Sequence, residues 1–134
     1  MSPLDDTIFV REREVNGVIV LSVVRELKGA VEATLRQRID HHVSKGFKKI
    51  LIDLDGLPYM DSTDLGRLIR CHLSVRQAGG RVRICNISEK VWEILKLTRL
   101  DTVLDLYHTE EEALASIHAS SAPVPHSPAE AENP

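Results

Sequence analysis

The sequence predicts one small α/β domain with a mixed, mostly parallel sheet and flanking helices, in the order ββαβαβαβα. Three observations support this class. A length of 134 residues suits a single core, and 43% hydrophobic with 28% charged residues is ordinary for a globular protein. Short apolar runs alternate with helix-length amphipathic segments, which implies parallel crossovers. Asn16-Gly17 separates the first two apolar runs and predicts one antiparallel hairpin.

The first two strands form that hairpin. The first is expected to begin at Ile8 and to lie at an edge of the sheet, because alternating Arg and Glu over residues 11–14 discourage pairing with another strand. Asn16 and Gly17 both accept positive φ, which a two-residue hairpin turn requires. The nearly continuous apolar run over residues 18–24 is typical of a strand that is covered on both faces.

A helix is predicted from Ala30 to about Lys45. Its apolar residues recur every four positions, and Gly46 can adopt the left-handed conformation that ends a helix. The next strand covers residues 50–54 and leads into a turn over residues 55–58. The apolar positions of the helix are Val31, Leu35, Ile39 and Val43.

The second half of the chain repeats this alternation. A helix to about Gln77 ends before Gly79-Gly80, and a short strand follows over residues 81–85. The helix is expected to bury residues spaced as one helical face, namely Leu65, Leu68, Ile69, His72 and Leu73.

The last elements are a helix, a strand and a helix. Ser88 is a suitable N-cap for a helix that turns Val91, Ile94 and Leu95 inward. A brief strand is expected over residues 103–106. Thr109 and Glu112 have the spacing of a capping box, which predicts a final helix to about His118.

The ordered domain is expected to cover residues 8–118. Residues 1–7 are interpreted as a flexible arm. Residues 119–134 are rich in Ala, Ser, Pro and Glu, and such a segment buries too little apolar surface to offset its chain entropy. We therefore predict a disordered tail.

Bulk properties restrict the classes of partner. The net charge of -3 and the scattered basic residues argue against nucleic acid, and no apolar run approaches the roughly 20 residues that insert across a bilayer. The N-terminus lacks the pattern of a secretory signal. Cys71 and Cys85 fit neither a disulfide framework nor a zinc site, so both are predicted to be reduced and in or near the core. These features favour the cytoplasm.

The segment Asp61-Ser62-Thr63-Asp64-Leu65-Gly66 is the candidate functional site. It follows a buried strand and a turn, and it begins an amphipathic helix. The first turn of a helix has unpaired backbone N–H groups that readily hold a phosphate. Ser62 is therefore either a simple capping residue or a phosphorylation site.

Two other functions for this region would need further residues. A nucleophilic Ser62 would need a neighbouring base, but His72 lies ten residues along the same helix, His41-His42 belong to another helix, and no Gly-x-Ser-x-Gly surrounds it. Enzyme activity is not expected. Asp53 or Asp55 could instead accept a phosphoryl group with Mg²⁺, as in response-regulator receivers, although residues 25–28 hold only one acid. No nucleotide or metal motif is present, so no cofactor is predicted.

Residues 58–66 resemble the signature of STAS domains, especially bacterial anti-sigma factor antagonists, in which an aromatic residue and Met precede Asp, Ser, Ser or Thr, Gly, Leu and Gly. The likeness continues at residues 77–80, 86–88 and 98–100. It covers about residues 8 to 118.

This resemblance implies a cytoplasmic partner-switching protein, either a monomer or a weak dimer. It would bind an anti-sigma factor that is also a serine kinase. That kinase would phosphorylate Ser62, with Thr63 as the less favoured acceptor, and a phosphatase would reverse the modification. ATP would belong to the kinase. The implied partner-binding residues are Glu26, Lys28, Asp61, Ser62, Thr63 and Asp64. A STAS scaffold or transport-complex subunit that is never phosphorylated is the alternative.

Two positions depart from the pattern of the family. Asp64 stands where the family usually has Gly, and we expect its charge in the first helical turn to stabilise the helix by about 0.3–1 kcal/mol. We also expect that charge to lie where a kinase approaches. Lys28 stands where the family tends to have an acid. An ion pair between Lys28 and Asp64 would compensate both changes.

Overall fold

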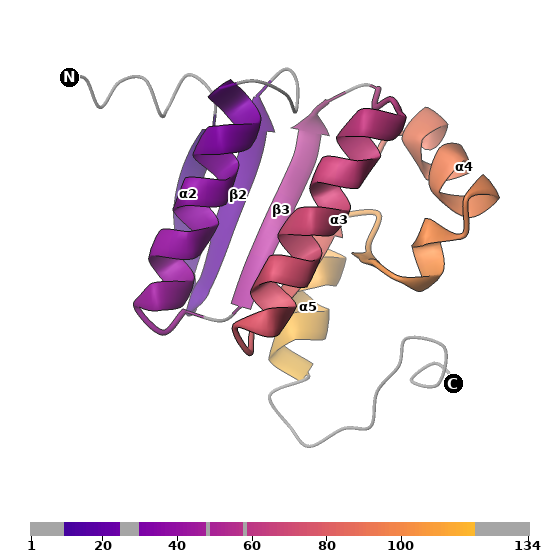
Figure 1. Ribbon diagram of the computed structural model, residues 1–134. Helices are drawn as coiled ribbons and strands as arrows, with labels where there is room; N and C mark the ends of the chain where they lie inside the picture. Colours follow the sequence, from indigo (N-terminus) through magenta and orange to yellow (C-terminus); the bar gives the residue numbers. More distant parts are fainter. Residues whose placement is uncertain (1–9, 25–29, 48, 58, 120–134) are drawn as a thin grey trace.

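The computed structural model describes residues 10–24, 30–47, 49–57 and 59–119, which form one five-stranded sheet with helices on both faces (Figure 1). The elements are β1 (Val10–Val15), β2 (Val18–Val24), α2 (Ala30–Ser44), β3 (Lys49–Gly56), α3 (Ser62–Gln77), β4 (Arg81–Cys85), α4 (Glu89–Leu97), the 3₁₀ helix η1 (Leu100–Thr102), β5 (Asp105–Leu106) and α5 (Glu110–Ala119). This confirms the predicted α/β class.

The strands lie in sequence order, with β1 and β5 at the edges. β1 pairs with β2 antiparallel, whereas the pairs β2–β3, β3–β4 and β4–β5 are parallel. The hairpin turn has φ values of 49° at Asn16 and 86° at Gly17, as the sequence predicted. Because the chain always returns through a helix after β2, the C-terminal ends of the parallel strands share one edge, where α3 begins.

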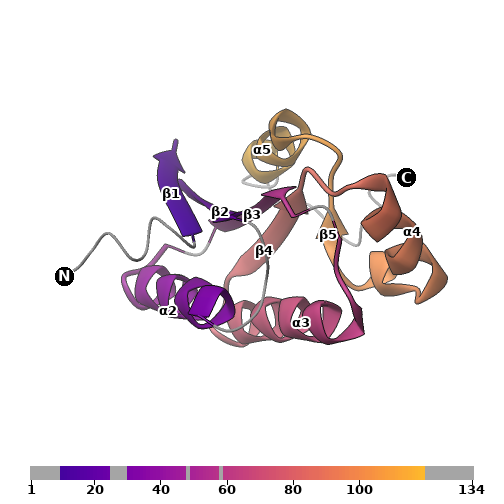
Figure 2. The ribbon, with the colours of Figure 1, turned by 90° about the horizontal axis from the view of Figure 1, so that it is seen from above.

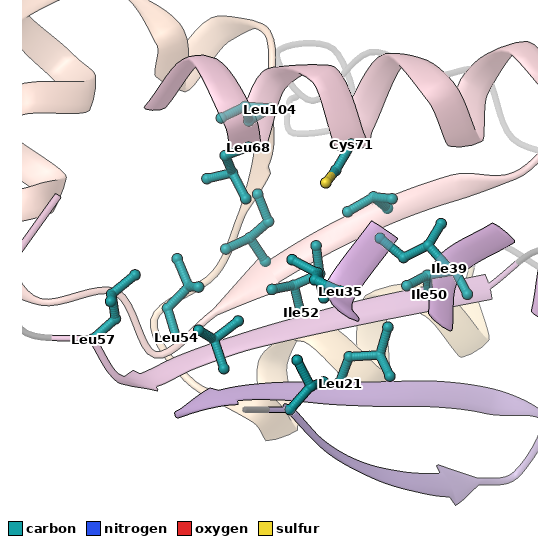
Figure 3. Close-up of a cluster of buried hydrophobic side chains, with 14 of the residues drawn as sticks. Leu21, Leu35, Ile39, Ile50, Ile52, Leu54, Leu57, Leu68, Cys71 and Leu104 are labelled. Atoms are coloured by element: carbon teal, nitrogen blue, oxygen red, sulfur yellow. The ribbon is translucent and has the colours of Figure 1, made fainter. Parts of the chain in front are cut away.

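α2 and α3 cover one face of the sheet, and α5 lies on the other (Figure 2). The larger core forms between the sheet and the two helices, where alternate strand residues meet the buried side of each helix (Figure 3). Its fully buried members include Leu21, Leu35, Ile39, Ile50, Ile52, Leu54, Leu68 and Ile84.

The face under α5 has a smaller core and more polar contacts. Its buried residues are Val18, Val20, Leu51, Cys85, Ala113 and Ile117. Arg83 is only 2% exposed on β4, and its Nε donates to Ser116 Oγ of α5 over 3.3 Å. The Ser116 hydroxyl is also 2.6 Å from the Tyr107 hydroxyl. Hydrogen bonds thus help to hold α5, where apolar area is limited.

Three local predictions were wrong. β3 continues through Asp55 to Gly56, because the sheet extends into the segment expected to turn. The final strand is only Asp105–Leu106, since the amides of Val103 and Leu104 donate to the Leu100 carbonyl and prolong the η1 turn. Leu73 is 49% exposed rather than buried. The buried face of α3 lies on the opposite side of the helix from Leu73. It includes Leu65, Leu68, Cys71, His72 and Val75.

Several predictions fall outside the described residues. These are the N-terminal arm, the start of the first strand at Ile8, the loop with Glu26 and Lys28, and all of the predicted tail beyond Ala119. The final helix α5 ends at Ala119, one residue later than expected. In the described part of the chain, no helix is both long enough and apolar enough to cross a membrane.

Candidate functional site

Asp61 caps α3 and so organises the candidate site. Its backbone is extended, with φ −93° and ψ −178°, and its Oδ1 accepts a hydrogen bond from the Asp64 amide over 2.9 Å. Asp64 Oδ2 in turn accepts from the Asp61 amide over 3.1 Å. The two acids therefore form a reciprocal capping box, which satisfies backbone donors that a helix start leaves unpaired.

Ser62 and Thr63 are the first two residues of α3, and both are exposed. Because Asp61 provides the cap, the fold does not need either hydroxyl for that purpose. Neither hydroxyl makes a hydrogen bond within the part of the chain that the structure describes. Both side chains are thus exposed to solvent at the edge of the sheet where β3 ends.

Asp64 lies beneath this surface. Only 5% of the residue is exposed, and Arg67 Nη1 donates to Asp64 Oδ1 over 2.9 Å. The carboxylate is therefore buried and paired rather than exposed, and the expected effect of its charge on an approaching kinase stays a prediction. Lys28 lies outside the described residues, so its predicted pairing with Asp64 stays a prediction. Arg67 was missed, although its spacing of three residues from Asp64 is typical of helical ion pairs.

Asp53 forms a separate polar cluster on β3. It is buried, at 9% exposure, and its carboxylate accepts hydrogen bonds from Ser22 Oγ over 3.1 Å and Asn86 Nδ2 over 2.9 Å. The Asp55 amide donates a third bond over 2.9 Å. These contacts join β2, β3 and the residue after β4. Because all three are donated to the carboxylate, Asp53 is suited to holding the strands together.

A hollow of about 460 Å³ lies beside this cluster. It is lined by both signs of charge, so it has no clear preference for an anion or a cation. Arg13, one of its basic residues, forms an ion pair with Glu110 of α5. Among the described residues, no group of three or more His, Cys, Asp or Glu side chains could hold a metal ion. The lining residues are Arg11, Glu12, Arg13, Ser22, Val23, Asp53, Asp55 and Gly56.

Two histidines and both cysteines are buried in the core or at its edges. His72 is buried on α3, and desolvation lowers its pKa below 6.5. Burial raises the pKa of the thiols to about 11 for Cys71 and about 12 for Cys85, which makes both poor nucleophiles. Both cysteines are free and buried, as predicted. His42 is also buried, with Nε2 only 2.9 Å from Glu12 Oε2 on β1.

One aromatic contact could not be anticipated from spacing. Trp92 on α4 is of intermediate exposure and stacks on His108, with ring centroids 4.4 Å apart and planes inclined by 22°. The two residues are 16 positions apart in the sequence, and His108 belongs to the segment between β5 and α5. The contact helps to join the end of the sheet to α4.

Known proteins resemble this chain over nearly all of the described residues. Residues 10–113 match the family model described as the STAS domain. A Thermotoga maritima protein assigned as an anti-sigma factor antagonist is 29% identical over 104 residues, or 77% of this chain and 92% of that protein. The anti-sigma F factor antagonist of Paenibacillus polymyxa is 24% identical over 106 residues, covering 78% and 91%.

A solved structure gives the same result. The crystal structure of an assigned anti-sigma factor antagonist from Thermotoga maritima superimposes with a TM-score of 0.72 at 27% identity. The superposition covers 81% of this chain and 94% of that chain. The likeness therefore extends from the sequence to the arrangement of helices and strands.

Proposed function

This chain belongs to the STAS domain family, and we propose that it acts as an anti-sigma factor antagonist whose partner binding is switched by phosphorylation of Ser62. The names of its relatives support the first part of this proposal. The second part rests on the exposed hydroxyl of Ser62, which lies at the start of α3 and makes no hydrogen bond with any described residue.

The switch acts through charge at the binding surface. A phosphoserine carries about 1.5 to 2 negative charges at neutral pH, and the first turn of a helix accommodates negative charge. The fold therefore tolerates the modification, while a partner that fits the neutral surface is repelled. The proposed partner surface comprises Asp61, Ser62 and Thr63, and we expect Glu26 and Lys28, which lie outside the described residues, to contribute to it. Asp64 contributes from below, by holding Asp61 in place.

The chemistry is supplied by the partner. In the kinase reaction, Ser62 Oγ attacks the γ-phosphorus of ATP that the anti-sigma factor binds. A new oxygen–phosphorus bond forms, ADP leaves, and the hydroxyl proton is released. A phosphatase restores Ser62 with water and releases inorganic phosphate. This chain is the substrate in both reactions and contributes no cofactor and no catalytic group.

The proposal places the protein in the cytoplasm, as a monomer or weak dimer. The receiver-like alternative is disfavoured, because the Asp53 carboxylate is 9% exposed and already accepts three hydrogen bonds. A STAS scaffold or transport-complex subunit that is never phosphorylated would use the same surface without the switch. Whether Ser62 is phosphorylated in the host distinguishes the switched antagonist from the scaffold or transport-complex subunit.

The decisive experiment begins with capture of the native partner from host extract, followed by mass spectrometry of the captured protein and of Ser62. Binding of the purified partner is then measured by calorimetry. We expect Ser62→Asp to weaken binding by about tenfold or more, which corresponds to about 1.4 kcal/mol. Ser62→Ala is expected to bind like wild type, and so is the control Gln77→Glu, which adds a negative charge at the exposed far end of α3. Equal affinities for Ser62→Asp and Ser62→Ala would refute the switch.

A further inference from the structure

Arg70 on α3 reaches back toward Ser62. The Arg70 Nη1 lies 3.9 Å from the point where a Cβ on Gly66 would stand. Ser62, Gly66 and Arg70 follow one another at steps of four residues, so they lie along one side of the helix. Side chains on a helix lean toward its N-terminus, which is the direction of Ser62.

Gly66 leaves the space between Ser62 and Arg70 open. It lies inside α3, where glycine costs roughly 0.5–1 kcal/mol relative to alanine. Gly66 is not among the glycines with positive φ, and a Cβ at this position would meet Arg70 Nη1 at an ordinary contact distance. Neither backbone conformation nor crowding therefore explains a glycine at this position. Because Gly66 has no side chain, the helical turn between the Ser62 hydroxyl and the Arg70 guanidinium, about 6 Å long, is left uncovered.

Arg70 differs from Arg67 in its pairing and from Arg76 in its distance from Ser62. Arg67 is engaged by the buried Asp64, with Nη1 and Oδ1 2.9 Å apart. Arg70 is exposed and forms no ion pair with a residue that the structure describes. Arg76 is exposed as well, but it lies almost four turns from Ser62. The guanidinium of Arg70 is thus the uncommitted positive charge on this side of the described part of α3.

We propose that Arg70 is the positioning residue for phosphorylated Ser62, pairing with the phosphate across Gly66. The proposal rests on the proposed function, since it describes the modified form of the same site. The phosphate then lies along α3 and covers the turn at Gly66. It excludes a partner from this side of the helix by occupying the surface as well as by charge. Guanidinium and phosphate suit such a pairing because both are charged and the guanidinium offers several donors.

The test uses protein that carries phosphoserine at position 62 by genetic encoding, so no kinase is needed. The second pKa of the phosphate is measured by ³¹P NMR at low salt. We expect Arg70→Gln to raise it by about 0.5, because a neighbouring cation favours the dianion. Arg70→Lys should restore most of the difference. The control Arg76→Gln, at an exposed position far along the same helix, should leave the pKa unchanged.

Two results would overturn the pairing. One is an identical phosphate pKa in wild type and Arg70→Gln, and the other is an equal response to Arg76→Gln. Salt gives an independent check, since the difference should shrink at about 1 M, where the screening length is near 3 Å. Failure of the proposed function appears separately, as equal partner affinity of the phosphorylated and unmodified chains. Each proposal can therefore fail without the other.

Discussion

Two polar groups lie near the same end of β3 and serve opposite purposes. Asp53 is buried, and its carboxylate accepts hydrogen bonds from Ser22, Asn86 and the backbone of Asp55. Ser62 lies nine residues later, is exposed, and makes no hydrogen bond with any described residue. The comparison shows that acidic and hydroxyl groups at a strand end need not form one site. Those that join strands belong to the fold, and those without a structural role are available to a partner.

The largest expected effect comes from removing the buried carboxylate. Asp53→Ala should lower the free energy of unfolding by about 2–3 kcal/mol, because it leaves partly buried donors on Ser22 and Asn86 without their acceptor. Urea denaturation followed by circular dichroism measures this. Asp55→Ala is the matched control on the same strand, and its exposed side chain should contribute within about 0.5 kcal/mol. Similar losses for the two variants would contradict the assignment of Asp53 to the fold.

The helix cap should have a smaller effect. Asp61→Ala removes the acceptor for the Asp64 amide and is expected to cost about 1 kcal/mol. Asp61→Asn should retain most of the stability, since asparagine caps helices about as well as aspartate. Ser62→Ala and Thr63→Ala should be close to neutral in the same denaturation assay. A large loss for either hydroxyl variant would show that the fold uses that side chain.

Gly66→Ala is expected to stabilise the protein by about 0.5–1 kcal/mol, measured by thermal unfolding. The physical reason is that alanine restricts the unfolded chain and meets only Arg70 Nη1, at 3.9 Å, in the folded one. Gly79→Ala is the contrasting variant, because φ at Gly79 is +87° and a side chain there is strained. It should destabilise. A loss of stability at Gly66 would mean that the glycine is required by the fold.

The smallest expected effect is the pH dependence of stability that arises from His72, which is buried on α3. Burial lowers the pKa of His72 below the 6.5 of an unfolded chain. Above pH 6.5 both states are neutral and the stability is complete. As pH falls below 6.5 the unfolded state takes up a proton that the folded state resists, so stability is lost. His72→Leu should remove this part of the pH dependence. Parallel stability curves for wild type and variant between pH 7.5 and 5 would contradict it.

Much of the fold could be predicted because its signals are local. The hairpin at Asn16-Gly17, the cap at Ser88 and the left-handed Gly46 each depend on a few neighbouring residues, and all three are confirmed. The Thr109–Glu112 box is confirmed in part. The Glu112 amide donates to Thr109 Oγ1, but the Glu112 carboxylate accepts from His108 instead of Thr109. The spacing of Thr109 and Glu112 therefore predicts the cap, but the conformation of the residues before the helix decides which amide donates to the Glu112 carboxylate.

The sequence by itself determined the order of elements, the start of α3 near Asp61, and Ser62 as the candidate for modification. The tertiary structure alone decided which acids are accessible. Parallel register brings Ser22 opposite Asp53, and Asn86 directly follows the β4 residue that pairs with Asp53, although 31 and 33 residues separate them from it. Burial likewise removed Asp64 from the surface. Local patterns act over about one helical turn, whereas burial depends on which distant segments the sheet brings together.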